Sequence, residues 1–165
     1  MVELGLFVEE RIELLDGWLV EMSPSNPPHA QAIRVLSRCL AEARQGVDLQ
    51  VQLPLALSDH SEPEPDLALV PAGDYWGGHP TAAHLVIEVA DASLRKDRGP
   101  KALAYALAGV PEYWVVNLVD RVVEVYTEPG AEGYGAVQRV AGDAVLSPGE
   151  FPEIQVPVAR LFPAE

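Results

Sequence analysis

The stretch HLVIEVA, residues 84–90, decides the fold of this chain, because it is an almost unbroken apolar run. A strand with apolar side chains on both faces is typical of the centre of a sheet that is covered on both sides. Glu88 interrupts the run between Ile87 and Val89. A buried carboxylate is costly unless it is paired or bound to a cation. Glu88 therefore either faces water or belongs to a functional site.

A second carboxylate, Asp66, stands at the start of the apolar run in SEPEPDLALV, residues 61–70. The two acids before it, Glu62 and Glu64, alternate with prolines, and we expect them to be solvated loop residues. If the strands that carry Asp66 and Glu88 pair, their carboxylates lie side by side. Two close carboxylates repel each other and favour a bound cation. Hard oxygen ligands of this kind suit Mg²⁺ or Mn²⁺.

The elements on either side of these strands follow from periodicity and turn signals. Turns are expected at Asp16-Gly17, where apolar runs flank a two-residue signal, and near Val119-Asp120. The patterns predict a hairpin over 12–22, a helix over 29–45 stopped by Gly46, a strand over 47–57, a helix over 97–109 with Pro100 in its first turn, and a hairpin over 112–127. We expect only short strands after residue 128.

This order of elements predicts one domain over residues 1–165. Its fold class is mixed α/β (α+β), with a central mixed sheet that has helices on both sides and an N-terminal β-hairpin. The core is expected to span about residues 9–128, and residues 129–165 form a C-terminal extension.

Lys101 is the third residue with a possible chemical role. It lies in the helix predicted after Glu88, and Tyr105 follows one turn later on the same face. If that face looks toward Glu88, the Lys101 ammonium can hold an attacking water or a scissile phosphate. A solvated lysine on the surface of the helix is an equally simple interpretation. His29, which opens the first helix, can also reach the site, although a capping or exposed position is the simpler interpretation.

The composition limits the function classes. The chain of 165 residues has a formal net charge of −14, which argues against the basic footprint of a typical nucleic-acid-binding protein. Four of its 11 basic residues nevertheless fall within 95–101. The single cysteine, Cys39, excludes an internal disulfide and a cysteine-based zinc site. No signal peptide or apolar run of about 18 residues is visible, so we expect a cytoplasmic protein without a membrane span.

The chain resembles the Uma2 family over about residues 9–128. The similar segments are IELLDGWLVEMSP, PEPDLALV, HLVIEVADAS and RKDRGPKALAYALAGVPEYWVVNLVDRVVEVY. Uma2 is a group of bacterial proteins often labelled restriction endonucleases, within the PD-(D/E)XK nuclease superfamily. The resemblance implies a restriction-endonuclease-like core and a metal-dependent endonuclease that acts on nucleic acid, with DNA as the expected substrate. It also implies a homodimer, for which the apolar segment FPEIQVPVARLF, residues 151–162, offers weak support.

The resemblance also implies roles for individual residues. Asp66 matches the "PD" aspartate, and Glu88 matches the second acid of the motif. The lysine expected two positions later is replaced by Ala90, so Lys101 takes its place, with Lys96 as the fallback. The remaining implied roles are a further carboxylate at Glu13, a metal ion (Mg²⁺ or Mn²⁺) bound by Asp66, Glu88 and the carbonyl of Val89, and phosphate contacts from Arg95, Lys96 and Arg98.

Several departures from the family pattern keep a second hypothesis open. DAS at residues 91–93 replaces the more usual Ser-Pro-Ser, Pro100 occupies a position where a glutamate is common, and the chain is strongly acidic. The alternative is a catalytically silent nuclease-fold protein that serves as a binding or assembly module. The presence of Asp66, Glu88 and Lys101 together favours the enzyme.

Overall fold

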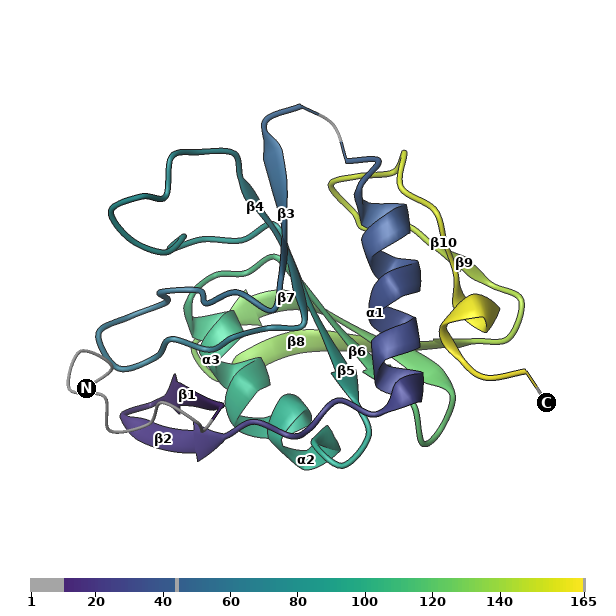
Figure 1. The fold of residues 1–165 in the computed structure, drawn as a ribbon, viewed down its shortest axis with the longest axis horizontal. Helices are drawn as coiled ribbons and strands as arrows, with labels where there is room; N and C mark the ends of the chain where they lie inside the picture. The colour runs from purple at the N-terminus through teal and green to yellow at the C-terminus, as the bar shows by residue number, and fades with distance from the viewer. Residues whose placement is uncertain (1–10, 44, 165) are drawn as a thin grey trace.

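The centre of the molecule is a six-stranded mixed sheet with helices on both sides, as Figure 1 shows. The computed structural model describes residues 11–43 and 45–164. The strand order is β3-β4-β5-β6-β7-β8, and β5 and β6 are parallel while the other neighbours are antiparallel. This arrangement confirms the predicted fold class, including the N-terminal hairpin.

The strands of the sheet and the other elements have the following bounds. The sheet consists of β3 (Val47–Val51), β4 (Leu67–Pro71), β5 (Leu85–Ala90), β6 (Glu112–Asn117), β7 (Val122–Gly130) and β8 (Gly133–Ala141). Two short antiparallel pairs stand apart from it: β1 (Ile12–Leu15) with β2 (Trp18–Glu21), and β9 (Val145–Leu146) with β10 (Val156–Pro157). The helical elements are α1 (Pro27–Leu40), α2 (Leu94–Lys96), a π-helical turn (Asp97–Lys101), α3 (Ala102–Leu107) and a 3₁₀ turn (Val158–Leu161).

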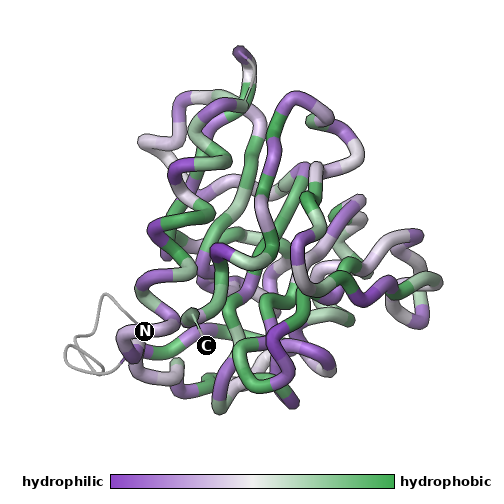
Figure 2. The backbone as a smooth tube through the Cα atoms, turned by 90° about the vertical axis from the view of Figure 1, so that its right-hand side faces the viewer, coloured by the Kyte–Doolittle hydropathy of each residue, from purple (hydrophilic) through white to green (hydrophobic). Residues whose placement is uncertain are grey.

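Strand β5 is buried along its whole length, as its apolar sequence predicts. Alternate side chains of β5 enter two separate cores. Leu85, Ile87 and Val89 pack in the cluster that contains α1, whereas Val86 and Ala90 pack with α3. Figure 2 shows that the central strands are mostly hydrophobic and that hydrophilic segments lie in the outer loops.

The pairing of β4 with β5 fixes the relation between the two motif acids. Leu67 lies opposite Ile87 in this antiparallel pair. The next position in the same register places Asp66 opposite Glu88, and side chains opposite each other project from the same face of a sheet. The predicted pairing of these strands is therefore confirmed.

The predicted ends of the first helix and of the strand after it are wrong. Helix α1 begins with Pro27 at its first position, where Asn26 caps the N–H of His29, but it ends at Leu40 instead of residue 45. The last buried residue of its apolar face is Leu40, and β3 begins at Val47, so the intervening chain has to turn. Gly46, with a φ of +89°, belongs to that turn. Strand β3 is also shorter than predicted, because Gln52 has a φ of +52° and leaves the extended conformation.

Pro100 does not lie in the first turn of its helix. The helical segment begins earlier, at Leu94, and Pro100 lies in the π-helical turn between α2 and α3. Proline has no N–H to donate, and its ring clashes with a carbonyl four residues earlier in a regular α-helix. The wider π-helical turn removes that conflict, and such turns are frequent at functional sites.

The C-terminal part contributes more to the fold than predicted. Only short strands were expected after residue 128, yet β8 spans nine residues and pairs with β7 along most of its length. The turn between them uses Gly133, with a φ of +115°. The apolar side chains of the tail are buried in the α1 core, namely Phe151, Ile154, Val156, Val158 and Leu161. They therefore do not form the surface for association that the sequence suggested.

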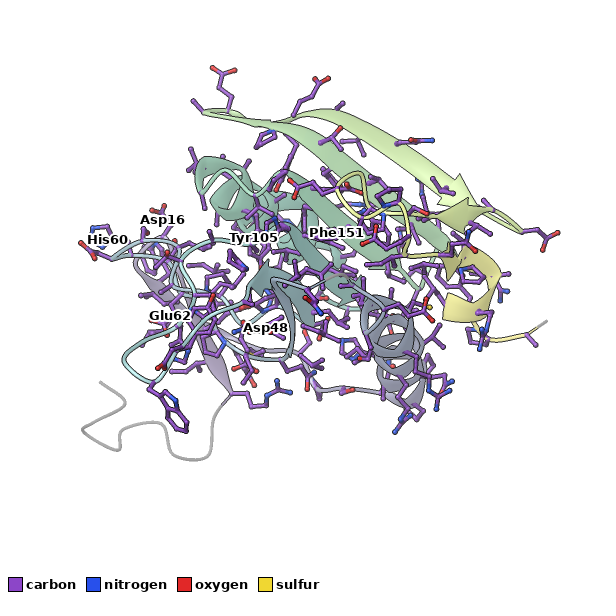
Figure 3. The ribbon with its side chains drawn as sticks, turned by 90° about the horizontal axis from the view of Figure 1, so that it is seen from above. Asp16, Asp48, His60, Glu62, Tyr105 and Phe151 are labelled. Atoms are coloured by element: carbon purple, nitrogen blue, oxygen red, sulfur yellow. The ribbon has the colours of Figure 1, made fainter. Side chains whose placement is uncertain are left out.

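Figure 3 shows the same division between interior and periphery at the level of side chains. Tyr105 and Phe151 are fully buried, one in each core. Asp16 and His60 lie at the outer end of the molecule, where the β1–β2 turn meets the loop before β4. The N–H of Gly17 donates to the carbonyl of His60 at 2.7 Å, so this contact anchors the hairpin on the loop that leads to Asp66.

Candidate active site

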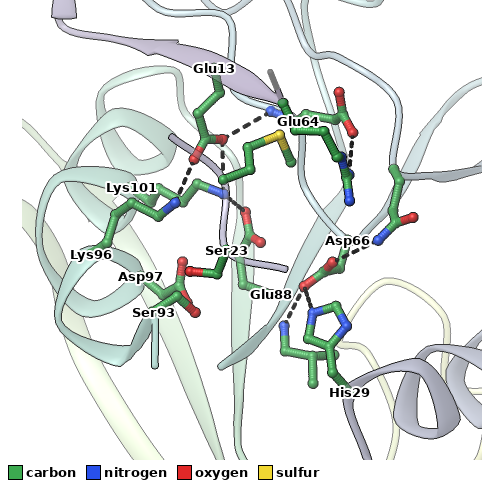
Figure 4. A pocket seen from close by; sticks show the side chains of 14 residues that line it. Glu13, Ser23, His29, Glu64, Asp66, Glu88, Ser93, Lys96, Asp97 and Lys101 are labelled. Carbon is green, nitrogen blue, oxygen red and sulfur yellow. Dashed lines mark hydrogen bonds and ion pairs between the residues drawn. The ribbon is translucent and has the colours of Figure 1, made fainter. Parts of the chain in front are cut away.

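A polar pocket lies where four parts of the chain meet: the β1–β2 hairpin, the start of α1, the ends of β4 and β5, and the π-helical turn (Figure 4). Its cavity of about 30 Å³ has room for about two water molecules or a small ion. Fourteen residues line it, among them the carboxylates Glu13, Glu64, Asp66, Glu88 and Asp97 and the basic side chains Arg11, His29, Lys96 and Lys101.

Glu88 lies at the centre of this pocket and is almost completely buried. Its Oε1 accepts two hydrogen bonds of 2.7 Å, one from Lys101 Nζ and one from the hydroxyl of Tyr105. The predicted shared face of Lys101 and Tyr105 therefore does look toward Glu88. Both hydrogen bonds that Glu88 accepts within the described part of the chain end on Oε1, so Oε2 has no protein donor there.

Asp66 is held from the other side of the pocket. Its Oδ2 accepts the N–H of Val89 at 2.8 Å and lies 3.1 Å from Nε2 of His29. Among the residues that the structure describes, Oδ1 accepts one hydrogen bond, a long contact of 3.4 Å from the Gln52 amide. Each motif acid thus has one oxygen fixed by strong protein hydrogen bonds and one oxygen available to a ligand.

Lys101 is fixed between two carboxylates. Its ammonium lies 2.7 Å from Glu88 Oε1 and 3.0 Å from Glu13 Oε2, and its side chain is 3% exposed. Glu13 also pairs with Lys96 at 2.9 Å and accepts the N–H of Glu64 at 3.2 Å. An ammonium has three donors, so the two ion pairs leave Lys101 one N–H for a water or a phosphate oxygen.

The electrostatics of the pocket separate its two motif acids. Burial, together with the charges of Asp97, Asp66 and Glu13, raises the pKa of Glu88 to about 8 despite the opposing charge of Lys101. Burial also opposes ionisation of Asp66, but the hydrogen bonds from His29 and Val89 outweigh it, so the pKa of Asp66 lies below its ordinary value. Asp66 is consequently ionised at neutral pH, whereas the raised pKa of Glu88 lets this acid take up a proton when no cation is bound.

The same environment acts on the basic side chains. Burial opposes the charge of Lys101, but the negative charges of Glu88, Glu13 and Asp97 outweigh it and raise the pKa of the ammonium. The hydrogen bond to Asp66 raises the pKa of His29. The five acids of the pocket outnumber its four basic side chains, and a bound cation would favour the ionised form of Glu88.

The donor set fits an oxygen-binding divalent cation. Among residues 11–43 and 45–164, no group of three or more His, Cys, Asp and Glu side chains is placed to hold a metal ion. Mg²⁺ does not require one, because it keeps several of its waters and binds through one or two carboxylates together with substrate phosphates. Asp66 and Glu88 line the same cavity and are the two carboxylates that would take this role.

The predicted phosphate-binding residues do not lie together. Lys96 lines the pocket but is paired with Glu13. Arg98 points away from the pocket, and its guanidinium donates to both oxygens of Glu124 on β7. Arg95 is exposed on α2. The structure therefore does not assemble Arg95, Lys96 and Arg98 into one phosphate-binding cluster.

Sequence reasoning underestimated three residues of the pocket. His29 was expected to cap α1 or to be exposed, yet its ring contacts Asp66. Glu64 was expected to be solvated, yet it lines the pocket and pairs with Arg11 at 2.9 Å. Asp97 was expected only as the first residue of a helix, yet it is buried and lines the pocket. Its position four residues before Lys101 was the available signal, because residues at this spacing share a helix face.

The architecture resembles that of known nuclease-like proteins. A crystal structure described as "a putative nuclease belonging to DUF820", from Anabaena variabilis ATCC 29413, superposes with a TM-score of 0.71 and covers 93% of this chain and 90% of its own. Its sequence identity of 14% shows a shared fold. No protein of the curated set matches the sequence.

The family follows from the sequence itself. The model of the Uma2 family, whose description is "Putative restriction endonuclease", matches residues 6–159. The chain belongs to the Uma2 family. The family description names a restriction endonuclease, and proteins of the restriction-endonuclease-like kind generally use divalent metals. Within the described residues, no helix combines the length and the apolar character that a membrane span needs.

Proposed function

We propose that this protein is a metal-dependent phosphodiester hydrolase, an endonuclease whose substrate is DNA. The observation that carries the proposal is the convergence of Asp66, Glu88 and Lys101 on one small cavity, with one oxygen of each acid free of strong protein donors. Asp66, Glu88 and the carbonyl of Val89 would hold Mg²⁺ or Mn²⁺. The bound ion would supply an activated water and neutralise negative charge on the phosphate.

The protein residues then have separate tasks. The remaining N–H of Lys101 donates to a phosphate oxygen or to the attacking water and so offsets the charge that develops during hydrolysis. Glu13 holds the ammonium in place, and Tyr105 fixes the orientation of Glu88. His29 fixes Asp66 in the same way. Lys101, rather than Lys96, fills the role of the motif lysine, because it is the lysine bonded to Glu88.

The test compares hydrolysis by the wild type and by Asp66→Asn, Glu88→Gln and Lys101→Met. Supercoiled DNA, single-stranded DNA and RNA are incubated with Mg²⁺, Mn²⁺ or EDTA. We expect cleavage of DNA by the wild type with either metal, none with EDTA, and a loss of about 10²-fold or more in each variant, since each removes a group that acts in the transition state. The matched control is Glu62→Gln, because Glu62 comes from the same loop and its side chain is 42% exposed.

Calorimetric titration with Mn²⁺ separates the two functional hypotheses. Binding that weakens in Asp66→Asn but not in Glu62→Gln supports the metal site independently of activity. Equal cleavage by the wild type and all three pocket variants would identify a contaminating nuclease. Nucleic-acid binding without cleavage under any condition would favour the catalytically silent binding module.

A further inference from the structure

The basic side chains that are free to contact the phosphates of a nucleic acid are not the ones that the sequence suggested. Five of the described Lys and Arg side chains pair with carboxylates: Arg11, Lys96, Arg98, Lys101 and Arg139. These pairs use up most of the basic segment over residues 95–101. The basic side chains without an ion pair inside the described ranges are Arg34, Arg38, Arg95, Arg121 and Arg160, and all five are exposed.

Four of these five arginines, namely Arg34, Arg38, Arg121 and Arg160, are linked through α1, the 3₁₀ turn near the C-terminus and the β6–β7 turn. Arg34 and Arg38 are one turn apart on the exposed side of α1. Arg38 and Arg160 line the same groove of about 320 Å³, between α1 and the 3₁₀ turn near the C-terminus. Glu42 is the one carboxylate among the residues that line this groove, and it forms no ion pair with a described residue.

Arg121 connects this group of arginines to the β6–β7 turn of the central sheet. Arg121 lies 6.0 Å above the ring of Phe162, which directly follows the 3₁₀ turn of Arg160. Arg121 belongs to the turn after β6, and the N–H of Leu118 in this turn donates to the carbonyl of Ala90 at 2.9 Å. Ala90 is two residues from Glu88 on β5. The turn that carries Arg121 is therefore anchored at the end of β5, the strand that also carries Glu88.

We propose that Arg34, Arg38, Arg121 and Arg160, here called the arginine face, bind the phosphate backbone of the nucleic acid outside the cleavage site. This inference rests on the proposed function and specifies how the substrate is held. Guanidinium groups bind phosphate oxygens through two parallel hydrogen bonds. In a chain with a net charge of −14, unpaired arginines gathered on one side supply the local attraction that the acidic pocket lacks.

The test measures the salt dependence of binding with fluorescently labelled duplex and single-stranded DNA in EDTA, where no cleavage occurs. The face variant is Arg38→Gln/Arg160→Gln. We expect the slope of log K against log salt concentration to become shallower by about 2 for duplex DNA, about 1 for each lost phosphate contact. Arg121→Gln should lower the slope by about 1. The matched control for Arg121→Gln is Arg139→Gln, which removes the same charge from an exposed arginine that is paired with Asp120 outside the face and should retain the wild-type slope.

Three results would overturn the inference, and they are distinguishable. A face variant that keeps the wild-type slope, while the wild type cleaves DNA with Mg²⁺ or Mn²⁺, rejects the arginine face and leaves the proposed function intact. An equal loss of slope in Arg121→Gln and Arg139→Gln shows an effect of net charge alone. A wild type that neither binds nor cleaves nucleic acid rejects the proposed function together with the face.

Discussion

At the scale of single residues, protein donors bind strongly to one oxygen of each motif carboxylate in the pocket. Glu88 gives one oxygen to Lys101 and Tyr105, and Asp66 gives one oxygen to His29 and the backbone of Val89. The second oxygen of each acid is not bound so strongly. Protein donors thus orient both acids and leave the second oxygen of each available to a cation. A purely structural ion pair does not require such a free oxygen.

The raised pKa of Glu88 predicts an unusual dependence of stability on pH. In the unfolded chain Glu88 ionises near pH 4.5, whereas in the folded protein without metal it keeps its proton until about pH 8. The folded state therefore binds the extra proton within this window, and the free energy of unfolding should fall by a few kcal/mol between about pH 5 and pH 8. The pKa of Asp66 is lowered, so its contribution changes only in acid, outside the window.

Thermal unfolding in EDTA from pH 5 to pH 9 checks this prediction. The melting temperature of the wild type should decrease with pH and level off above pH 8, and the decrease should be much smaller in Glu88→Gln, which mimics the protonated acid. A residual slope is expected from His29, whose raised pKa acts in the same direction. Added Mn²⁺ should stabilise the wild type most at high pH, because it binds the ionised acid. A flat profile for the wild type contradicts the raised pKa.

At the scale of secondary structure, the π-helical turn decides which side chains enter the pocket. A π-helical turn contains one residue more than the α-helical turn that it replaces. It lets Lys101 reach Glu88 while Lys96 reaches Glu13 and the carbonyl of Asp97 accepts a hydrogen bond from Tyr113 at 2.9 Å. A regular helix through the same residues would turn the part before the bulge by about 100° relative to α3.

Deletion of Gly99 tests this role of the turn. The shortened helix should keep Lys101 in register with α3 but rotate Lys96 and Asp97 out of place. Loss of the ion pair and the buried hydrogen bond should cost at least about 2 kcal/mol. For a chain of this size, that loss lowers the melting temperature by roughly 4–8 °C.

The matched control for the deletion is Gly99→Ala. A Cβ at Gly99 meets no atom within 4 Å, and the residue does not need a positive φ, so this substitution should change the melting temperature by less than about 2 °C. Equal stability of the deletion variant and the wild type would show that the extra residue is not what positions Lys96 and Asp97.

At the scale of the whole molecule, segments that stand apart from the central sheet complete the pocket and one of the two cores. The N-terminal hairpin brings Glu13 to the pocket, and the C-terminal tail fills the core under α1. The burial of this tail removes the argument from sequence that its apolar residues promote association. The homodimer therefore remains a prediction from the resemblance, in which two copies would present two cleavage sites to the two strands of a duplex.

Light scattering during size-exclusion chromatography measures the oligomeric state directly. We expect a mass of twice the 17.8 kDa of one chain, independent of concentration over the micromolar range. Because the charge of −14 makes like copies repel, the dimer should be more stable at moderate than at low salt concentration. A mass of one chain at every concentration and salt condition rejects the homodimer.

The sequence by itself determined the central strands and the acids that they carry. The apolar run around Glu88 is a local pattern, and so is the position of Asp66 between Pro65 and an apolar strand. The register of β4 and β5 follows from matching their apolar faces. Lys101 and Tyr105 were also predictable as a pair, since their spacing places them on one helix face. These features depend on interactions between residues that are close in the chain or on the regular alternation of a strand.

Only the tertiary structure decided which charges meet across the pocket. Lys96 and Arg98 look alike in the sequence, yet one turns to Glu13 and the other to Glu124, because the π-helical turn changes the helical phase between them and α3. His29 reaches Asp66 because α1 begins beside the start of β4, a contact between residues 37 positions apart. Whether an arginine is free to bind phosphate depends on such long-range partners, and these are set by packing.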